Sequence, residues 1–296
     1  MKPRRKKAKL KKAKAAPKTA KPKLELPLAR FNGELMLIGA GKMGGALLQG
    51  WLSRGLPRDK ITVIEPEPDK RLRALAERGL KLNPPRRGKA SVVVLGVKPQ
   101  IAADVVGVAA RAADTTSLVI SIMAGRTLAF LEKAFPSGTP IVRAMPNLPA
   151  SIGRGITVAV GNRGVDKRKR ALTAELLGAT GAVEWVEKEA LLDPVTAVSG
   201  SGPAYVFLLA EALTAAAVNA GLPAELAARL ARDTIAGSGE LLRQSPLDAA
   251  TLRKNVTSPG GTTAAALEVL MAADGLESLM TRAVAAATRR SRELAG

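Results

Sequence analysis

The chain has 296 residues, of which 47% are hydrophobic and only 2% aromatic, and its formal net charge at pH 7 is +21. It contains no Cys and no His, which excludes disulfides, thiolate nucleophiles, metal sites built on Cys or His, and imidazole acid–base catalysis. A chain of this length and composition buries a large core and is expected to form two domains, without a metal and in the cytoplasm.

The positive charge is concentrated at the N-terminus. Met1 to Lys23 contain twelve Lys and Arg and no acidic residue. Such a segment has too few apolar side chains to join a core, so residues 1–30 are predicted to form a disordered basic arm. The arm lacks the apolar stretch of a secretory signal. It is either a solvated terminus without a specific role, which we favour, or a weak and non-specific binder of anionic surfaces or nucleic acid.

A glycine-rich turn follows the first predicted strand. Leu35–Ile38 is typical of a buried strand, and the sequence GAGKMG leads from it into a helix over residues 46–52. This is the G-x-G-x-x-G pattern between strand and helix that binds the pyrophosphate of a dinucleotide. The predicted cofactor-binding residues of this turn are Gly39, Ala40, Gly41, Lys42, Met43 and Gly44.

An acidic residue ends the second predicted strand. Ile61–Glu65 places a carboxylate 21 positions after Gly44. At about this spacing a carboxylate accepts hydrogen bonds from the ribose of NAD(H) and repels the 2′-phosphate of NADP(H). Lys70 and Arg71 lie close enough in sequence to reach such a phosphate. The cofactor is therefore predicted to be NADH or NADPH, with NADH preferred.

Further apolar runs alternate with helical ones, which indicates a parallel sheet. The expected strands are 91–95, 118–122, 140–145, 157–160 and 183–186, and the expected helices are 71–78 and 165–177. Loops at the carboxyl ends of such strands form the ligand crevice, which would include the Met145-Pro146-Asn147 turn. Lys98 has two equally supported interpretations: it faces the ligands, or it is an ordinary solvated lysine of the loop. The cofactor-binding residues predicted in its loop are Gly96, Val97, Lys98 and Pro99.

The pattern becomes helical after Leu192. Ser199–Pro203 (SGSGP) is predicted to be a small-residue loop, and Ala204–Ala220 a helix that is apolar on nearly every side. A membrane span is the alternative for this helix, but the interior Glu211 and the many Ala residues argue against it. Further helices are expected over 224–242, 247–254, 264–272 and 276–292. The predicted fold class is α/β then all-α, with a Rossmann-like NAD(P)-binding domain over 31–193 and a helical domain over 194–296.

A turn between two of these helices is a candidate site for binding the substrate. In Asn255–Thr263 (NVTSPGGTT), Pro259 ends a helix, and Gly260 and Gly261 let a ligand approach the main chain. The next helix then presents free N–H groups, which suit a carboxylate. On the local pattern alone, an ordinary connection with a threonine cap is favoured.

Together these motifs resemble those of pyrroline-5-carboxylate reductases, over about Leu35–Leu294. The motifs that carry the resemblance are GAGKMG (39–44), VKP (97–99), RAMPN (143–147), SGSGPAY (199–205) and VTSPGGTT (256–263). Three features depart from the family. Lys254 stands where an acid is usual, Leu148 stands where Thr is common, and the basic arm is not a family feature.

The resemblance implies hydride transfer from NAD(P)H to the C=N carbon of 1-pyrroline-5-carboxylate, the last step of proline biosynthesis. A cyclic imine binds already protonated, so positioning and electrostatics can supply the catalysis without His or Cys. By resemblance, Thr263 and Lys98 are catalytic, with the Thr263 hydroxyl on the substrate nitrogen and Lys98 beside the nicotinamide. Ser258, Gly261 and Thr262 hold the carboxylate. The resemblance also implies a homodimer with interlocked C-terminal helices, often assembled into larger rings.

Two other classes of protein fit the same architecture. A β-hydroxyacid dehydrogenase is expected to carry a catalytic Lys on its helical side, where this chain has SPGGTT, and another imine reductase would share the fold. A non-enzymatic dinucleotide- or nucleic-acid-binding protein would instead use the basic arm. Oxidation of NAD(P)H in the presence of pyrroline-5-carboxylate separates these alternatives.

Overall fold

A computed structural model describes residues 28–85 and 88–295 of the chain. Most of the predicted basic arm therefore lies outside the described residues. Leu28, which the sequence analysis assigned to the arm, is buried at 1% exposure, and its N–H donates to the carbonyl oxygen of Arg54 at 3.2 Å. The packed part of the chain thus begins before residue 31, because a single leucine reaches the core.

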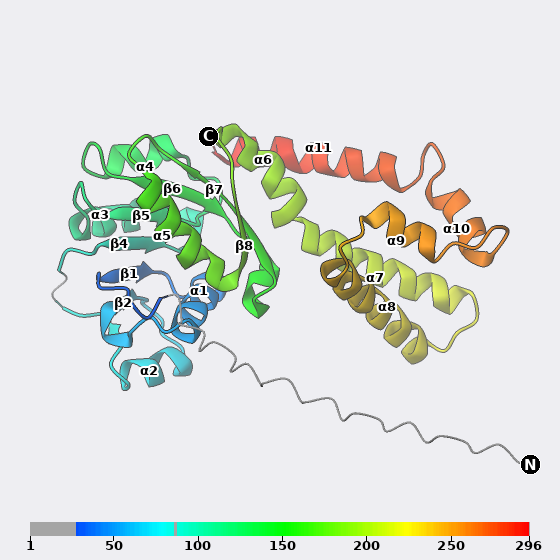
Figure 1. Cartoon of the computed structure of the whole chain (residues 1–296), viewed down its shortest axis with the longest axis horizontal. Helices are drawn as coiled ribbons and strands as arrows, with labels where there is room; N and C mark the ends of the chain where they lie inside the picture. The colour runs from blue at the N-terminus through cyan, green and yellow to red at the C-terminus, as the bar shows by residue number, and fades with distance from the viewer. Residues whose placement is uncertain (1–27, 86–87, 296) are drawn as a thin grey trace, which may run out of the picture.

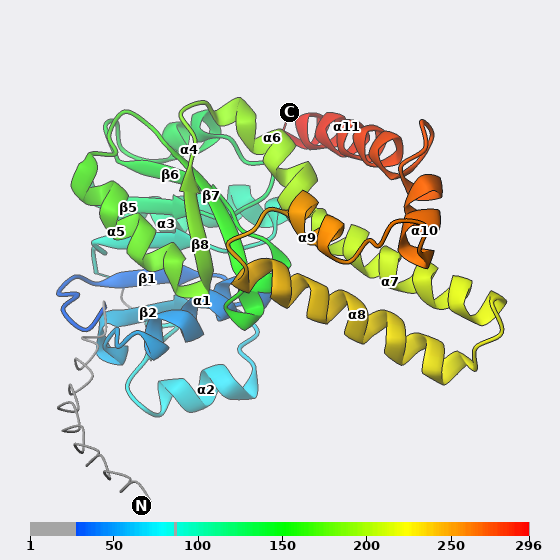
Figure 2. The ribbon, with the colours of Figure 1, turned by 45° about the vertical axis from the view of Figure 1, so that its right-hand side comes forward.

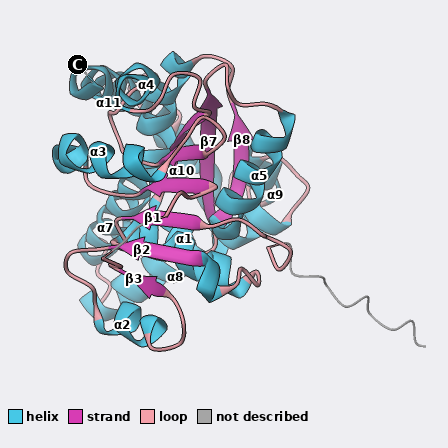
Figure 3. Ribbon diagram, turned by 90° about the vertical axis from the view of Figure 1, so that its left-hand side faces the viewer, coloured by secondary structure: helices cyan, strands magenta, loops and turns pink. Residues whose placement is uncertain are grey.

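An eight-stranded sheet forms the first half of the molecule (Figures 1 and 3). The strand order is β3-β2-β1-β4-β5-β6-β7-β8, and neighbouring strands are parallel except for the antiparallel pair β6–β7. The direction of winding reverses between β1 and β4, which is where sheets of this kind bind ligands. The strands are β1 Leu35–Ile38, β2 Ile61–Ile64, β3 Lys81–Leu82, β4 Val92–Leu95, β5 Leu118–Ser121, β6 Ile141–Met145, β7 Gly155–Gly161 and β8 Gly181–Trp185.

Helices cover both faces of the sheet (Figure 3). On one face, Leu47 and Trp51 of α1 and Leu176 of α5 belong to one hydrophobic cluster. On the other, Val106 and Ala109 of α3 belong to a second. The helices are α1 Lys42–Ser53, α2 Lys70–Ala76, α3 Ala102–Ala112, α4 Leu128–Ala134 and α5 Lys167–Leu177. This is the Rossmann-like layer predicted from the sequence, with β3, α3 and α4 as elements that the sequence analysis did not identify.

The second half of the chain is helical, as predicted. It contains α6 Leu192–Val195, a π-helical turn Thr196–Gly200, α7 Gly202–Asn219, α8 Ala224–Gln244, α9 Ala249–Asn255, α10 Thr262–Leu270 and α11 Leu276–Ala295. The prediction of a loop over Ser199–Pro203 is wrong. These residues continue a helical run, because Pro203 lies in the first turn of α7, where no N–H is needed. A Cβ on Gly200 would lie 2.6 Å from the Met145 Cε, so small residues let this turn approach β6.

The helical region extends away from the sheet, with α7 and α8 packed together and α11 returning to α6 (Figures 1 and 2). At that return, the Ser291 hydroxyl donates to the Asp193 carboxylate at 2.8 Å. No residue of α7 is fully buried in the described chain, and its Phe207 and Leu208 are 55% and 62% exposed. One helical run in the described part of the chain, Glu189–Asn219, is long and apolar enough by length and composition to cross a membrane.

Candidate functional site

The turn between β1 and α1 has the shape of a pyrophosphate cradle. Gly39 adopts a φ of +90°, and a Cβ on it would lie 2.7 Å from the Val97 Cγ1. A Cβ on Gly44 would lie 2.0 Å from the Gly39 carbonyl oxygen. Gly41, by contrast, has nothing within 4 Å in the direction of a Cβ, and it begins α1 without a side-chain cap. The free N–H groups of the first turn therefore face open space, which fits the phosphates of a dinucleotide.

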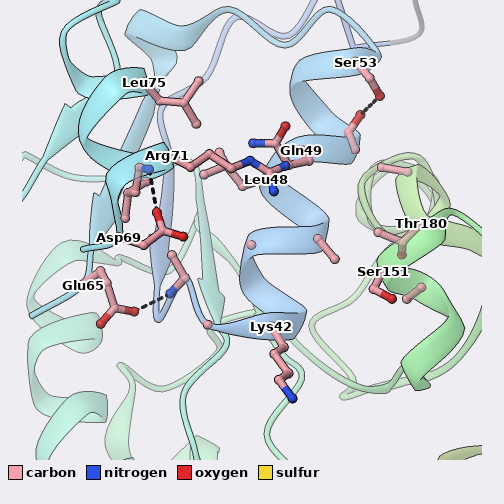
Figure 4. Close-up of a pocket in the computed structure, with 18 of the residues that line it drawn as sticks. Lys42, Leu48, Gln49, Ser53, Glu65, Asp69, Arg71, Leu75, Ser151 and Thr180 are labelled. Carbon is pink, nitrogen blue, oxygen red and sulfur yellow. Dashed lines mark hydrogen bonds between the residues drawn. The ribbon is translucent and has the colours of Figure 1, made fainter. Parts of the chain in front are cut away.

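A cavity of about 750 Å³ opens beside this turn along α1, with α2 on one side and Ser151 and Thr180 on the other (Figure 4). The glycine turn lines one end of it, together with Glu65 and Glu67, which follow β2. Arg71 reaches from α2 across the cavity towards Gln49 of α1 (Figure 4). The cavity thus offers carboxylates that could bind ribose hydroxyls and a guanidinium that could bind a phosphate on the ribose. No three His, Cys, Asp or Glu side chains within the described ranges form a group able to hold a metal ion.

Glu65 lies against the glycine turn, as its spacing predicts. Its Oε2 accepts a hydrogen bond from the Ala40 N–H at 2.8 Å (Figure 4). Asn83 holds the main chain of Glu65 from the opposite side. The Glu65 N–H donates to the Asn83 Oδ1 at 2.9 Å, and the Asn83 Nδ2 donates to the Glu65 carbonyl at 2.7 Å. The sequence analysis did not identify Asn83, although an Asn before Pro is a common turn signal.

The loop after β4 brings Gly96, Val97, Lys98 and Pro99 to the same edge of the sheet. The Val97 Cγ1 occupies the space that a Cβ on Gly39 would need, and the Lys98 side chain is exposed. The loop is fixed by Arg126, whose Nε and Nη2 both donate to the Pro99 carbonyl, at 3.1 and 2.7 Å. The Arg126 guanidinium also lies 5.1 Å from the centre of the Phe130 ring. No sequence motif pointed to Arg126.

A partly buried ion pair joins the sheet to the start of the helical region. Arg143 of β6 is 6% exposed, and its Nη1 lies 2.7 Å from the Glu189 Oε1. The same oxygen accepts the N–H of Leu128 at 2.8 Å, which ties α4 into the pair. Two residues beyond the end of β6, the Asn147 Oδ1 accepts the Ile156 N–H of β7 at 3.0 Å. The turn after β6 is therefore held from both sides.

The predicted substrate loop lies between α9 and α10. Gly260 has a φ of +67°, and the Gly261 N–H donates to the Ser258 carbonyl at 3.1 Å, which closes a tight turn. Gly261 is the N-cap of α10 and has no side-chain cap, so the expectation of a threonine cap is wrong. Thr262 and Thr263 occupy the first turn instead, where their N–H groups have no partner inside the helix. Ser258 and Thr262 are exposed, and Thr263 is half-buried.

The helix before this loop has a carboxylate cap. The Asp248 Oδ1 accepts the Thr251 N–H at 2.7 Å. Hydrogen bonds from the Thr251 backbone and side chain hold the pKa of Asp248 below its usual value, despite a small opposing effect of burial. At the other end of α9, Lys254 is exposed in the last turn, where a cation suits the helix dipole.

The structure brings the cofactor residues together but leaves the substrate loop apart from them. Gly39–Gly44, Glu65 and Gly96–Pro99 meet at the carboxyl ends of the central strands. The loop Ser258–Thr263 lies at the entrance to α10, on the part of the helical region that is far from the sheet (Figures 1 and 2). One chain therefore has the predicted dinucleotide cradle and the predicted substrate loop at separate places.

Two family models match the chain. The pyrroline-5-carboxylate reductase dimerisation model matches residues 189–294. The model for NADP oxidoreductase, coenzyme F420-dependent, matches residues 34–125. The first covers the helical region and the second covers the glycine turn and the first strands.

Known proteins match over nearly the whole chain. The pyrroline-5-carboxylate reductase of Pseudomonas aeruginosa is 39% identical over 264 residues, covering 88% of this chain and 96% of the relative. That of Mycobacterium leprae is 40% identical with the same coverage. Among solved structures, the Coxiella burnetii pyrroline-5-carboxylate reductase superposes with a TM-score of 0.82 at 36% identity, covering 89% of this chain and 99% of the other. The Plasmodium falciparum pyrroline carboxylate reductase with NADP bound gives a TM-score of 0.73 at 29% identity, covering 90% and 99%.

Proposed function

The chain belongs to the pyrroline-5-carboxylate reductase family, and we propose a two-part active site for its reduction of 1-pyrroline-5-carboxylate to proline with NAD(P)H. The observation that carries the proposal is the separation, within one chain, of the dinucleotide cradle from the loop before α10. Each part has the chemistry for one reactant, and neither part has the chemistry for both.

The first part binds the cofactor, which supplies the hydride. Gly41 and the N–H groups at the start of α1 hold the pyrophosphate, and Gly39 and Gly44 let strand, turn and helix approach closely. The other cofactor contacts come from the side chain of Glu65 and from the loop Gly96–Pro99. The Lys98 ammonium stands beside the nicotinamide and favours a negatively charged substrate there.

The second part binds the substrate. The N–H groups at the start of α10, together with the hydroxyls of Ser258 and Thr262, donate hydrogen bonds to the substrate carboxylate, since a helix N-terminus favours an anion. The Thr263 hydroxyl hydrogen-bonds the ring nitrogen. A hydride added to the C=N carbon of the protonated imine gives the amine without a further proton, so no strong acid is required of the protein. Catalysis then consists of holding the C=N carbon in the path of the hydride.

A second copy of the chain brings the two parts together in this proposal. The apolar side chains that α7 leaves exposed need a cover, and an apolar helix in a soluble protein is buried by other helices or by a partner. Glu211 within this helix favours protein over lipid as that cover. We propose a homodimer with interlocked C-terminal helices, further assembled into a ring, with α10 of one copy facing the crevice of another.

We also retain three proposals that rest on the sequence. The Rossmann-like domain runs from the packed Leu28, and not from the expected residue 31, to residue 193, and the helical domain spans 194–296, close to the 189–294 match of the dimerisation model. The protein is cytoplasmic. The basic arm binds anions weakly at most, because a segment rich in Lys and Arg and poor in apolar residues attracts negative charge without specificity.

The cofactor preference provides the test of the first part. We propose that NADH is preferred, because Glu65 at the cradle accepts hydrogen bonds from ribose hydroxyls and repels a 2′-phosphate. Glu65→Ser should shift the ratio of kcat/KM for NADH over NADPH towards NADPH by about fivefold, the effect of roughly 1 kcal/mol from one partly exposed charge. Steady-state rates with pyrroline-5-carboxylate and each cofactor measure it. A wild-type preference for NADPH that Glu65→Ser leaves unchanged would show that Glu65 does not face the ribose.

A further inference from the structure

The amide side chain of Asn83 makes two hydrogen bonds to the main chain of Glu65, one to its N–H and one to its carbonyl. Its Oδ1 accepts the Glu65 N–H at 2.9 Å, and its Nδ2 donates to the Glu65 carbonyl at 2.7 Å. The Asn83 N–H in turn donates to the Val63 carbonyl at 2.9 Å, which continues the pairing of β3 with β2. The side chain of Asn83 thus takes the place of a further residue of β3, two residues beyond the last paired position of β2.

The backbone of Asn83 is adapted to this contact. Its φ of +46° makes it the one described residue other than glycine with a positive φ. Asn is among the few residues that accept this conformation, at a modest cost. Backbone conformations of this kind persist where neighbouring contacts hold them, and they gather at ligand-binding segments. Here the contact that holds it is the clamp on Glu65.

The clamp limits how Glu65 can move. Its N–H and carbonyl are bound by Asn83, its Oε2 is bound by the Ala40 N–H at 2.8 Å, and its successor Pro66 has a fixed φ. The carboxylate can therefore leave the glycine turn only if the Asn83 contacts break or the side chain rotates alone. Without the clamp, the segment after β2 would have room to swing the carboxylate away from the ribose.

We propose that Asn83 is a positioning residue that sets the cofactor preference by fixing Glu65 at the glycine turn. This inference rests on the proposed placement of Glu65 at the cofactor ribose. The discrimination between NADH and NADPH then depends on two residues: Glu65 contacts the ribose, and Asn83 holds Glu65 in place. Both hydrogen bonds of the Asn83 side chain go to the main chain of Glu65, so its proposed effect acts through Glu65.

Asn83→Gly removes the two side-chain hydrogen bonds to Glu65 but keeps the backbone conformation, because glycine adopts the same φ without strain. The ratio of kcat/KM for NADH over that for NADPH should fall about three- to fivefold. At saturating cofactor, kcat and the KM for pyrroline-5-carboxylate should stay within twofold of the wild type. Asn83→Asp keeps the acceptor for the Glu65 N–H but loses the donor, so it should show the same direction of change.

Asn162→Gly is the matched control. Asn162 also clamps main chain with its amide, accepting the Ile141 N–H at 3.0 Å and donating to the Thr139 carbonyl at 3.0 Å, but it lies near β6 and β7. Its loss should lower the melting temperature without changing the ratio. The double variant Asn83→Gly/Glu65→Ser should show the same ratio as Glu65→Ser alone, because the clamp acts only through the carboxylate.

The outcomes distinguish this inference from the proposal on which it rests. If Glu65→Ser changes the ratio and Asn83→Gly does not, the role of Asn83 is wrong while Glu65 keeps its place at the ribose. If Asn83→Gly weakens both cofactors equally, Asn83 supports the fold and not the preference. If neither substitution changes the ratio, both the placement of Glu65 and the inference drawn from it fail.

Discussion

At the scale of single residues, the site residues that the sequence predicts are those whose function depends on near neighbours. Gly39, Gly41 and Gly44 could be assigned from spacing alone, because a turn between strand and helix is a local structure. Glu65 follows from a spacing that the strand and helix lengths fix. Asn83 and Arg126 could not be found in this way. Their partners lie 18 and 27 positions away, and only the folded sheet brings them together.

The proposed role of Thr263 is tested by removing its hydroxyl. Thr263→Ala should lower kcat/KM for pyrroline-5-carboxylate about tenfold, the ~1.4 kcal/mol of one hydrogen bond, while cofactor affinity stays unchanged. Thr263→Ser keeps a hydroxyl and should recover most of the rate. Steady-state kinetics and cofactor titration measure both effects.

Thr257→Ala is the control for that substitution. The Thr257 hydroxyl donates to the Arg253 carbonyl at 2.7 Å, so it is engaged at the end of α9 and is not free for a ligand. Its loss should leave kcat/KM within twofold of the wild type. Equal losses for Thr257→Ala and Thr263→Ala would assign the effect to the stability of the loop instead of to a contact with the substrate.

At the scale of elements, the sequence predicts the strongly patterned segments and misses those with mixed signals. The uniformly apolar strands β1, β4 and β5 were identified, as were the long helices α8 and α11. Helix α3, with its β-branched residues and a glycine, and the two-residue β3 were not identified. The segment Ser199–Pro203 was predicted to be a loop from its composition, yet its small residues allow a helical turn to pack against Met145. Composition alone does not distinguish a glycine that forms a flexible loop from a glycine that lets a helical turn pack closely.

The loop after β4 offers a test at this scale. Arg126→Ala removes two hydrogen bonds to the Pro99 carbonyl, so the loop that carries Lys98 should loosen. We expect kcat/KM to fall about tenfold, the typical effect of losing a hydrogen bond to a charged group, and Arg126→Lys to recover part of it. Arg170→Ala is the control, because the Arg170 guanidinium also lies over an aromatic ring, 4.4 Å from the centre of Trp185, but away from this loop. A similar loss in both variants would argue against a role for the loop.

At the scale of the whole molecule, two features of the single chain are explained by the same proposal, a second copy of the chain. Its helical region exposes apolar side chains along α7, and its proposed substrate loop lies far from its own cofactor cradle. In the proposed dimer, a second copy that covers α7 of the first also supplies the missing half of the site. Composition and pattern predict an apolar helix that needs a cover. They do not predict where α10 lies relative to the sheet, because this depends on how the helices pack.

The measurement that tests the two-part site most directly is complementation between two inactive variants. Gly41→Asp places a carboxylate at the pyrophosphate, and Thr262→Asp places one at the substrate carboxylate, where an acid is tolerated at a helix N-terminus. Each homo-oligomer should be inactive. If one copy completes the site of another, chains that are unfolded together and refolded should regain about a quarter of the wild-type activity on random assortment in dimers. Mixed assemblies that form, as shown by differently tagged chains that co-purify, yet stay inactive would contradict the account.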